Sequence, residues 1–98
     1  MRRIRLMPEA ERTLTAQLDY LLERHATTAA QALKTRVERY LTGAVAPFPR
    51  TGKFIGEHGL WETWIPRTRL IVWYSFDDDE VAIITFWHGA QDRSSSDP

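Results

Sequence analysis

The sequence predicts an α+β fold in which a helical hairpin packs on one face of a mainly antiparallel sheet. Residues 3–7 alternate polar and apolar side chains, as a short strand does. Leucines then recur at helical spacing within 14–22, and a second apolar stripe of helical period follows within 29–41. Three later segments are rich in the β-branched and aromatic residues that favour strands: 60–66, 68–76 and 80–88. A strand, two helices and a three-strand meander indicate a two-layer sandwich.

The helices have recognisable ends. Pro8 suits the first turn of a helix, where its missing N–H costs nothing, and that helix is expected to end near His25. Thr27 or Thr28 is a candidate cap for the second helix, and Gly43 is a candidate stop. A link of two or three residues between the helices predicts an antiparallel hairpin that shares one apolar face.

Turn residues divide the rest of the chain. The breaks at 66–67 and 77–79 predict tight connections between the three strands. The segment 44–59 holds two prolines and three glycines and reads as a long loop, a feature that is often functional. We expect one domain over 1–93 and a flexible tail at 94–98.

The predicted sheet is apolar on both faces, because successive side chains of a strand point to opposite faces. The middle strand points two apolar sets to opposite faces of the sheet. One set is Leu70, Val72, Tyr74 and Phe76, and the other is Ile71 and Trp73. The last strand is expected to do the same. One of its apolar sets is Val81, Ile83 and Trp87, and the other is Ala82, Ile84 and Phe86. The helical hairpin covers only one face. Unless the long loop and the tail cover the other, that face exposes an apolar patch typical of protein-binding surfaces.

Composition excludes several classes of protein. The chain has 98 residues and no cysteine, which excludes disulfide scaffolds, thiol nucleophiles and cysteine-ligated metal sites. The longest uncharged apolar run, Leu70–Phe76, is far shorter than the roughly 20 residues that span a bilayer. The amino-terminal residues lack the apolar stretch of a signal peptide. We therefore expect a cytoplasmic protein with no membrane contact.

The formal charge is zero, from 13 basic and 13 acidic residues, but the two halves differ. Residues 1–53 carry ten basic and five acidic groups, a balance of +5, and residues 54–98 carry three and eight, a balance of −5. A general nucleic-acid binder usually has a net basic surface. Any such role therefore needs a local patch, and the alternative is two ordinary solvated faces of opposite sign.

Four cations are candidates for binding an anion. Arg69 begins the middle strand and Arg67 precedes it, while Arg50 and Lys53 bracket a turn that is expected to approach the same end of the sheet. Together they suit a phosphate or a partner's carboxylate. Exposed charge, or ion pairing within the chain, is the alternative interpretation.

Among the three histidines, whose spacing does not suit a metal, His88 is the candidate for chemistry. It ends the last predicted strand, where an imidazole with a pKa near 6.5 suits general acid or base catalysis. A structural role is the alternative.

Several segments together resemble one family. They are Met7–Glu11, Pro49–Lys53, Gly59–Ile65, Thr68–Tyr74 and Val81–Asp92, and they resemble the ParE/RelE toxin superfamily of type II toxin–antitoxin modules. The resemblance spans nearly the whole chain in the right order. The ending His-Gly-Ala-Gln-Asp at 88–92 looks more like the ParE branch.

The resemblance implies a RelE/ParE-like fold and a small toxin neutralised by a cognate antitoxin that covers the second apolar face. Antitoxin contacts would then come from four apolar side chains: Trp61, Ile71, Trp73 and Phe86. ParE-branch members inhibit DNA gyrase, whereas RelE-branch members are ribosome-dependent endoribonucleases that cut mRNA. Neither activity implies a metal or a small-molecule cofactor.

Position by position, Arg69 matches the arginine of the family's middle strand, His88 the terminal histidine, and Arg50 and Lys53 the basic turn. In the RelE-like alternative, Arg69 and His88 would be catalytic. That alternative is disfavoured because only Arg93 follows as a cation and no tyrosine follows His88. Trp61 and Leu70 replace residues that many relatives carry, so a third hypothesis is a non-toxic interaction module of the same fold.

Overall fold

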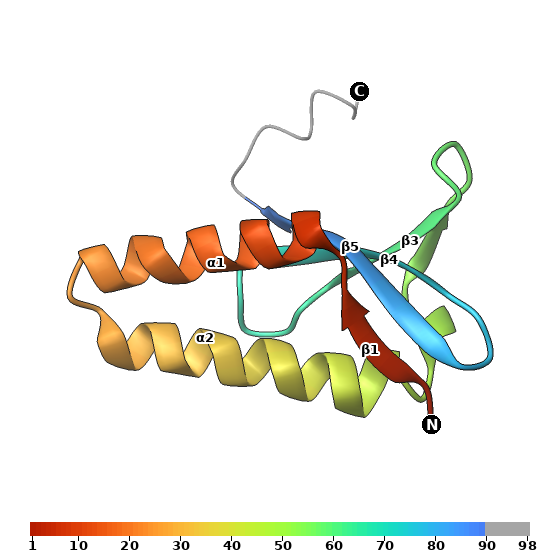
Figure 1. The fold of residues 1–98 in the computed structure, drawn as a ribbon, viewed down its shortest axis with the longest axis horizontal. Coiled ribbons are helices and arrows are strands. Elements are labelled where there is room, and N and C mark those ends of the chain that lie inside the picture. The colour runs from red at the N-terminus through yellow and green to blue at the C-terminus, as the bar shows by residue number, and fades with distance from the viewer. Residues whose placement is uncertain (90–98) are drawn as a thin grey trace.

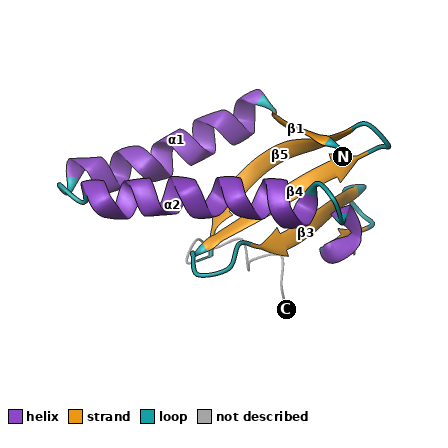
Figure 2. Cartoon of the chain, turned by 90° about the horizontal axis from the view of Figure 1, so that it is seen from below, coloured by secondary structure: helices purple, strands orange, loops and turns teal. Residues whose placement is uncertain are grey.

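The computed structural model describes residues 1–89 and confirms the α+β sandwich (Figure 1). Two helices and five strands follow one another along the chain: β1 (Arg3–Leu6), α1 (Pro8–Glu23), α2 (Thr27–Tyr40), β2 (Lys53–Ile55), β3 (Leu60–Trp64), β4 (Leu70–Phe76) and β5 (Glu80–His88). Figures 1 and 2 show α1 and α2 side by side, on one side of the sheet. The predicted tail 94–98 lies outside the described residues.

The sheet has the strand order β1-β5-β4-β3-β2. β1 runs parallel to β5, and the long connection that a parallel pair needs passes through the helical hairpin and then through strands β2 to β4. The other neighbours are antiparallel, as the predicted meander requires. The prediction missed β2, which lies within the segment interpreted as a loop, so the sheet has one strand more than expected.

The helix ends differ in part from the prediction. Pro8 opens α1, and a three-residue link leads to α2, as expected. Neither Thr27 nor Thr28 caps α2, because Ala26 holds the N-cap position and makes no side-chain bond. Gly43 does not end the second helix, because the chain continues from α2 through a π-helical turn, η1 (Leu41–Val45).

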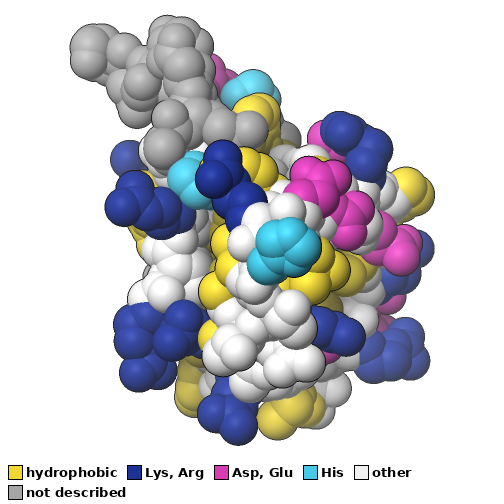
Figure 3. Space-filling view, turned by 90° about the vertical axis from the view of Figure 1, so that its left-hand side faces the viewer, with side chains coloured by type: hydrophobic (Ala, Val, Ile, Leu, Met, Phe, Trp, Pro, Cys, Tyr) yellow, Lys and Arg dark blue, Asp and Glu magenta, His cyan; other side chains and the backbone are white. Residues whose placement is uncertain are grey.

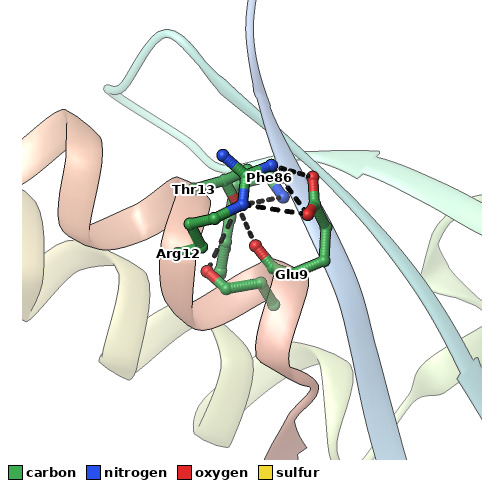
Figure 4. Close-up of polar contacts among 5 residues, drawn as sticks. Glu9, Arg12, Thr13 and Phe86 are labelled. Carbon is green, nitrogen blue, oxygen red and sulfur yellow. Dashed lines mark hydrogen bonds and ion pairs between the residues drawn. The ribbon is translucent and has the colours of Figure 1, made fainter.

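Helix α1 is fixed to the sheet by one polar contact as well as by apolar packing. The Phe86 N–H donates to the Thr13 hydroxyl at 3.1 Å, and that hydroxyl donates to the Glu9 carbonyl at 2.9 Å (Figure 4). Beside it, Arg12 and Glu9 form an exposed ion pair at 2.6 Å. β1 pairs with β5 only as far as Ile83, so Thr13 satisfies a backbone donor that the sheet leaves without a strand partner.

The core lies between the helical hairpin and the sheet. Its buried members come from α1, α2, η1, β4, β5 and the residue that follows β3: Ala10, Val37, Leu41, Val45, Ile65, Leu70, Val72, Tyr74, Val81, Ile83 and Phe86. No helix of the described chain is both long and apolar enough to cross a membrane.

A β-bulge in β5 changes which of its side chains enter that core. Trp73 lies opposite Thr85 and Tyr74 lies opposite Ile83, so Ile84 has no partner in the ladder. One inserted residue reverses the alternation of side chains beyond it. The predicted faces of β5 are therefore correct up to Ile83 and wrong after it: Phe86 joins the core.

The segment before β2 is held against the sheet by Tyr74. The Tyr74 hydroxyl donates to the Pro49 carbonyl at 2.6 Å and accepts from the Gly52 N–H at 3.2 Å. A Cβ at Gly52 would lie 2.5 Å from the Glu62 carbonyl oxygen and 2.6 Å from the Tyr74 oxygen. Only glycine allows this close approach of two backbone segments.

We expect Gly52→Ala to lower the free energy of unfolding by about 1–3 kcal/mol, because the new methyl group forces the turn away from β3 and Tyr74. Gly43→Ala is the matched control, since a Cβ there meets nothing within 4 Å. In its helical turn the control should be neutral or stabilising by about 0.4–1 kcal/mol. Urea unfolding of both variants tests this, and equal midpoints would contradict it.

Candidate functional site: an aromatic sheet face

The face of the sheet that points away from the helices is apolar, as predicted, but its exposure is smaller than expected: Trp64 is exposed, whereas Trp73 and Trp87 are half-buried. We call it the open face and define it by six residues of β3, β4 and β5: Glu62, Trp64, Ile71, Trp73, Thr85 and Trp87. Ile71 is completely buried between Trp64 and Trp87, its cross-strand neighbours, whereas Trp64 is 53% exposed. Such a run of indoles on a face without helices is typical of a protein-binding surface.

Trp73 lies at the centre of the open face and is held from three sides. Its Nε1 donates to the Glu62 carboxylate at 2.7 Å. Its ring meets the ring of Trp87 edge-on at 5.3 Å between centroids, and His58 from the β2–β3 turn lies over it at 5.3 Å. These contacts give Trp73 a fixed orientation before any partner binds.

Trp87 and Gly89 form the end of this face. The Trp87 Nε1 is buried and has no hydrogen-bond partner within residues 1–89. A Cβ at Gly89 would lie 2.7 Å from the Trp64 ring, so the absence of a side chain at residue 89 makes room for that indole. A buried donor that lacks a partner costs roughly 1–3 kcal/mol. Trp87 therefore carries a buried donor that no group within residues 1–89 satisfies.

The four predicted antitoxin contacts do not lie on one face. Ile71 and Trp73 belong to the open face. Phe86 is 3% exposed within the core, because the bulge turns it toward the helices. Trp61 lies opposite Tyr74 and therefore shares the helix side of the sheet. The expectation that Phe86 and Trp61 join Trp73 on one surface is wrong.

Trp61 instead belongs to an aromatic cluster at the far edge of the helix side. Its ring lies 5.4 Å from that of Phe54 and 5.6 Å from that of Phe76. Phe54 is 53% exposed on the edge strand β2. The cluster extends the core beyond the helices and ends in solvent.

The four predicted cations do not form a single anion site. Arg50 lies over the Phe76 ring at 6.0 Å, near the β4–β5 turn. Lys53 lies directly across from Glu62 in the β2–β3 ladder. Arg67 lies in the β3–β4 turn at the opposite end of the sheet and lines a groove with α2. The basic turn does not approach Arg67 and Arg69 as expected.

The structure does bring Arg69 and His88 together. They line one small hollow of about 170 Å³ between the ends of β4 and β5 and the helices. The other lining residues are all uncharged: Gln17, Tyr20, Leu21, Leu33 and Leu70. The Gly89 N–H donates to the Arg69 carbonyl and closes the ladder beside the hollow. The Arg69 guanidinium, the His88 imidazole and the Tyr20 phenol thus line the same hollow.

Sequence reasoning missed Trp64, His58 and Glu62 as parts of the open face. Trp64 and Glu62 are two residues apart in one predicted strand, so the period of two places them on one face, opposite to Trp61. That signal was present. His58 is different, because it reaches Trp73 through the shape of a turn, which strand periodicity does not encode.

Tyr74 has a shifted pKa because of its position beneath the turn. Burial raises the pKa of its phenol to about 12, although the Gly52 N–H opposes the shift by favouring the phenolate. The hydroxyl therefore stays protonated and keeps donating to Pro49 at neutral pH. No group of three His, Asp or Glu side chains in the described residues is arranged to hold a metal ion.

Comparison with known proteins identifies the family. The sequence profile of a family described as "ParE toxin of type II toxin-antitoxin system, parDE" matches residues 4–93. The chain belongs to the ParE toxin family. The resemblance to the ParE branch is therefore confirmed, and the chain belongs to a family of toxins from type II toxin–antitoxin systems.

A solved structure also shares the ParE fold. It is described as the chromosomal ParDE TA system from P. aeruginosa and superposes with a TM-score of 0.75 at 12% identity. The match covers 90% of this chain and 96% of that chain. At this identity the likeness establishes the fold alone. No curated protein sequence matched this chain.

The free energy of unfolding of this ParE protein should fall as pH rises from about 10 to about 12. The Tyr74 pKa is raised from 10.0 to about 12 in the folded state. The stabilisation is therefore complete below pH 10 and is lost as pH rises through 12, by at most about 2–3 kcal/mol.

Urea unfolding of wild type and Tyr74→Phe across this range tests the assignment. The advantage of wild type over the variant should shrink as pH rises. Tyr20→Phe, which alters a tyrosine that is 53% exposed, should keep a constant difference from wild type. A Tyr74→Phe difference independent of pH would contradict the assignment.

Proposed function

We propose that this chain is a toxin that inhibits DNA gyrase by protein–protein contact and is neutralised by a cognate antitoxin, both in the cytoplasm. Family membership supports the toxin role. The observation that carries the rest is the open face, an aromatic surface of fixed geometry that the protein's own helices leave uncovered. Inhibition by contact needs no metal, cofactor or catalytic group.

The open face is the proposed binding site of the antitoxin. Trp64 offers a large exposed ring, and aromatic side chains of this kind supply most of the binding energy at many interfaces. Trp73 is already oriented by Glu62 and His58, so little side-chain entropy is lost on binding.

Arg50 and Lys53 are the proposed contacts to the target. Arg50 is exposed beside Phe76 and borders a hollow of about 830 Å³ near the β4–β5 turn. Lys53 is exposed on the edge strand β2. Lys53 adjoins Phe54 in the strand, and Arg50 lies over the Phe76 ring. Exposed cations close to aromatic residues suit a protein target.

A second candidate function is a RelE-like endoribonuclease, which the shared hollow of Arg69, His88 and Tyr20 favours. In that reaction His88 would exchange a proton and Arg69 would stabilise the charged phosphorane. The hollow is small, however: its 170 Å³ is below the roughly 300 Å³ at which ordinary ligand pockets begin. Leucines from three elements also line it. We therefore rank this function second.

Purified protein without antitoxin should block the supercoiling of relaxed plasmid by gyrase, and Arg69→Ala should block it equally well, because contact inhibition does not use the hollow. The double variant Arg50→Gln, Lys53→Gln should inhibit less. The measurement is the concentration that halves supercoiling, read from topoisomer distributions on gels.

Two outcomes would contradict this function. Supercoiling that continues at high toxin excess excludes gyrase. Codon-specific mRNA cuts in a translation extract that disappear in Arg69→Ala would establish the nuclease instead. If expression causes no growth arrest and neither effect appears, the chain is a non-toxic interaction module.

The antitoxin is expected from a reading frame next to the gene, and Trp64→Ala should weaken its binding by about 30-fold, as for a hot-spot residue worth about 2 kcal/mol. Phe48→Ala is the matched control, because Phe48 is 70% exposed and lies off the open face. Titration calorimetry with the purified antitoxin measures both. Equal loss in the two variants would remove the open face as the binding site.

A further inference from the structure

A groove lies between α2 and the β3–β4 turn, apart from the open face. It has a volume of about 650 Å³. Figures 1 and 2 both place the β3–β4 turn beside the middle of α2. The groove is lined by small, polar and cationic residues: Thr28, Gln31, Ala32, Thr35, Arg36, Arg39, Tyr40, Gly43, Ala44, Pro66 and Arg67. Its small residues are Ala32, Gly43 and Ala44.

The charge of the groove has one sign. Three of its lining residues are arginines, and none of the described residues that line it is acidic. Within residues 1–89, no carboxylate forms an ion pair with Arg36, Arg39 or Arg67. Figure 3 shows one margin of the molecule where Lys and Arg side chains lie without acidic ones among them, whereas basic and acidic side chains are mixed along the other margin.

Arg67 enters the groove from a backbone conformation that favours glycine. Its φ is +61°, in the left-handed region, and it follows Pro66 in the turn. A glycine would adopt this conformation at lower cost, and Gly59 does so in the preceding hairpin at φ +66°. His25 in the α1–α2 link is the other described non-glycine residue with a positive φ, at +58°, so what distinguishes Arg67 is where its side chain lies. Here that side chain is a guanidinium at the rim of a cationic groove.

We propose that this groove binds an acidic segment of a partner protein, through carboxylates held by Arg36, Arg39 and Arg67. Guanidinium groups bind carboxylates with two parallel hydrogen bonds, and a planar fork suits Asp and Glu side chains presented along a peptide. Gln31, Thr28 and Thr35 supply further hydrogen bonds to its backbone. The site goes beyond the proposed contacts of the open face and does not depend on the identity of the toxin's target.

Charge and shape favour a peptide over a nucleic acid. Proteins that bind single-stranded nucleic acid place aromatic rings along a basic groove, on which the bases stack. The only aromatic residue among the described lining is Tyr40, and its hydroxyl is in a hydrogen bond with Thr63 at 3.0 Å. The acidic run Asp77–Glu80 and the zero net charge also oppose the broad phosphate contact of a duplex.

The test uses a short fluorescein-labelled peptide that combines glutamate with alanine and leucine, and a twin in which glutamine replaces glutamate. Fluorescence anisotropy measures their Kd for the full-length protein at about 0.05 and 0.15 M salt. We expect the acidic peptide to bind and the twin not to bind. Arg67→Gly should raise the Kd about tenfold, and the double variant Arg36→Gln, Arg39→Gln by more.

Arg67→Gly also separates binding from folding. Glycine relieves the left-handed backbone, so the Tm of this variant should equal or exceed that of wild type while binding is lost. Arg3→Gln, which removes an exposed charge from β1 at the opposite edge of the sheet, should leave the Kd unchanged.

Three results would overturn the proposal. The first is equal binding of the acidic peptide and its glutamine twin. The second is an equal loss of binding in Arg67→Gly and Arg3→Gln, which would reduce the effect to overall charge. The third is tighter binding of a single-stranded RNA of matched charge that displaces the peptide, which would assign the groove to nucleic acid.

Discussion

The bulge in β5 decides which side chains of this strand reach each face of the sheet. Both the core and the open face depend on it. Before Ile84, the odd-numbered residues face the helices; after it, the even-numbered ones do. Phe86 thereby completes the core, and Trp87 turns outward to meet Trp73. Without the inserted residue, the core would receive Thr85 and the open face would lose an indole. One extra residue in β5 thus places an aromatic side chain of this strand in the core and another on the open face.

The bulge lies where the hydrogen-bond partner of the outer edge of β5 changes. Up to Ile83 that edge pairs with β1, and at Phe86 it is satisfied by the Thr13 hydroxyl of α1. The chain leaves β1 into α1 at this point, so the helix takes over from the strand as the hydrogen-bond partner. Fixing α1 to Phe86 in turn holds the helical hairpin on one face, which leaves the other without helical cover.

Much of this architecture was predictable, because most of it rests on periodicity and turn residues. The helical stripes gave α1 and α2, and the strand-rich segments gave β3, β4 and β5 in their correct order. Two features, strand β2 and the bulge in β5, were not predictable from the sequence. β2 depends on the hydrogen bonds of Tyr74 with Pro49 and Gly52, which are contacts between distant parts of the chain. The bulge leaves only a faint signal, namely that Thr85 would be a polar residue at a core position.

The candidate sites divide in the same way. The apolar second face followed from the alternation in β4, which has no bulge. The assignments of Phe86 and Trp61 failed because one required the register of β5 and the other required the pairing of β3 with Tyr74. The four cations were expected together because all lie near turns. Turns at opposite ends of a sheet look alike in a sequence, and only the topology separates Arg50 from Arg67.

The two proposed partner surfaces differ in chemistry and lie on opposite sides of the sheet. The open face is aromatic and nearly uncharged, and its one carboxylate, Glu62, is engaged by Trp73. The groove beside α2 is cationic and has no indole. A compact partner that covers one surface cannot reach the other, whereas an extended chain that passes the β3–β4 turn can reach both. If one antitoxin occupies both surfaces, its segments must differ accordingly: an apolar stretch for the indoles and an acidic stretch for the arginines.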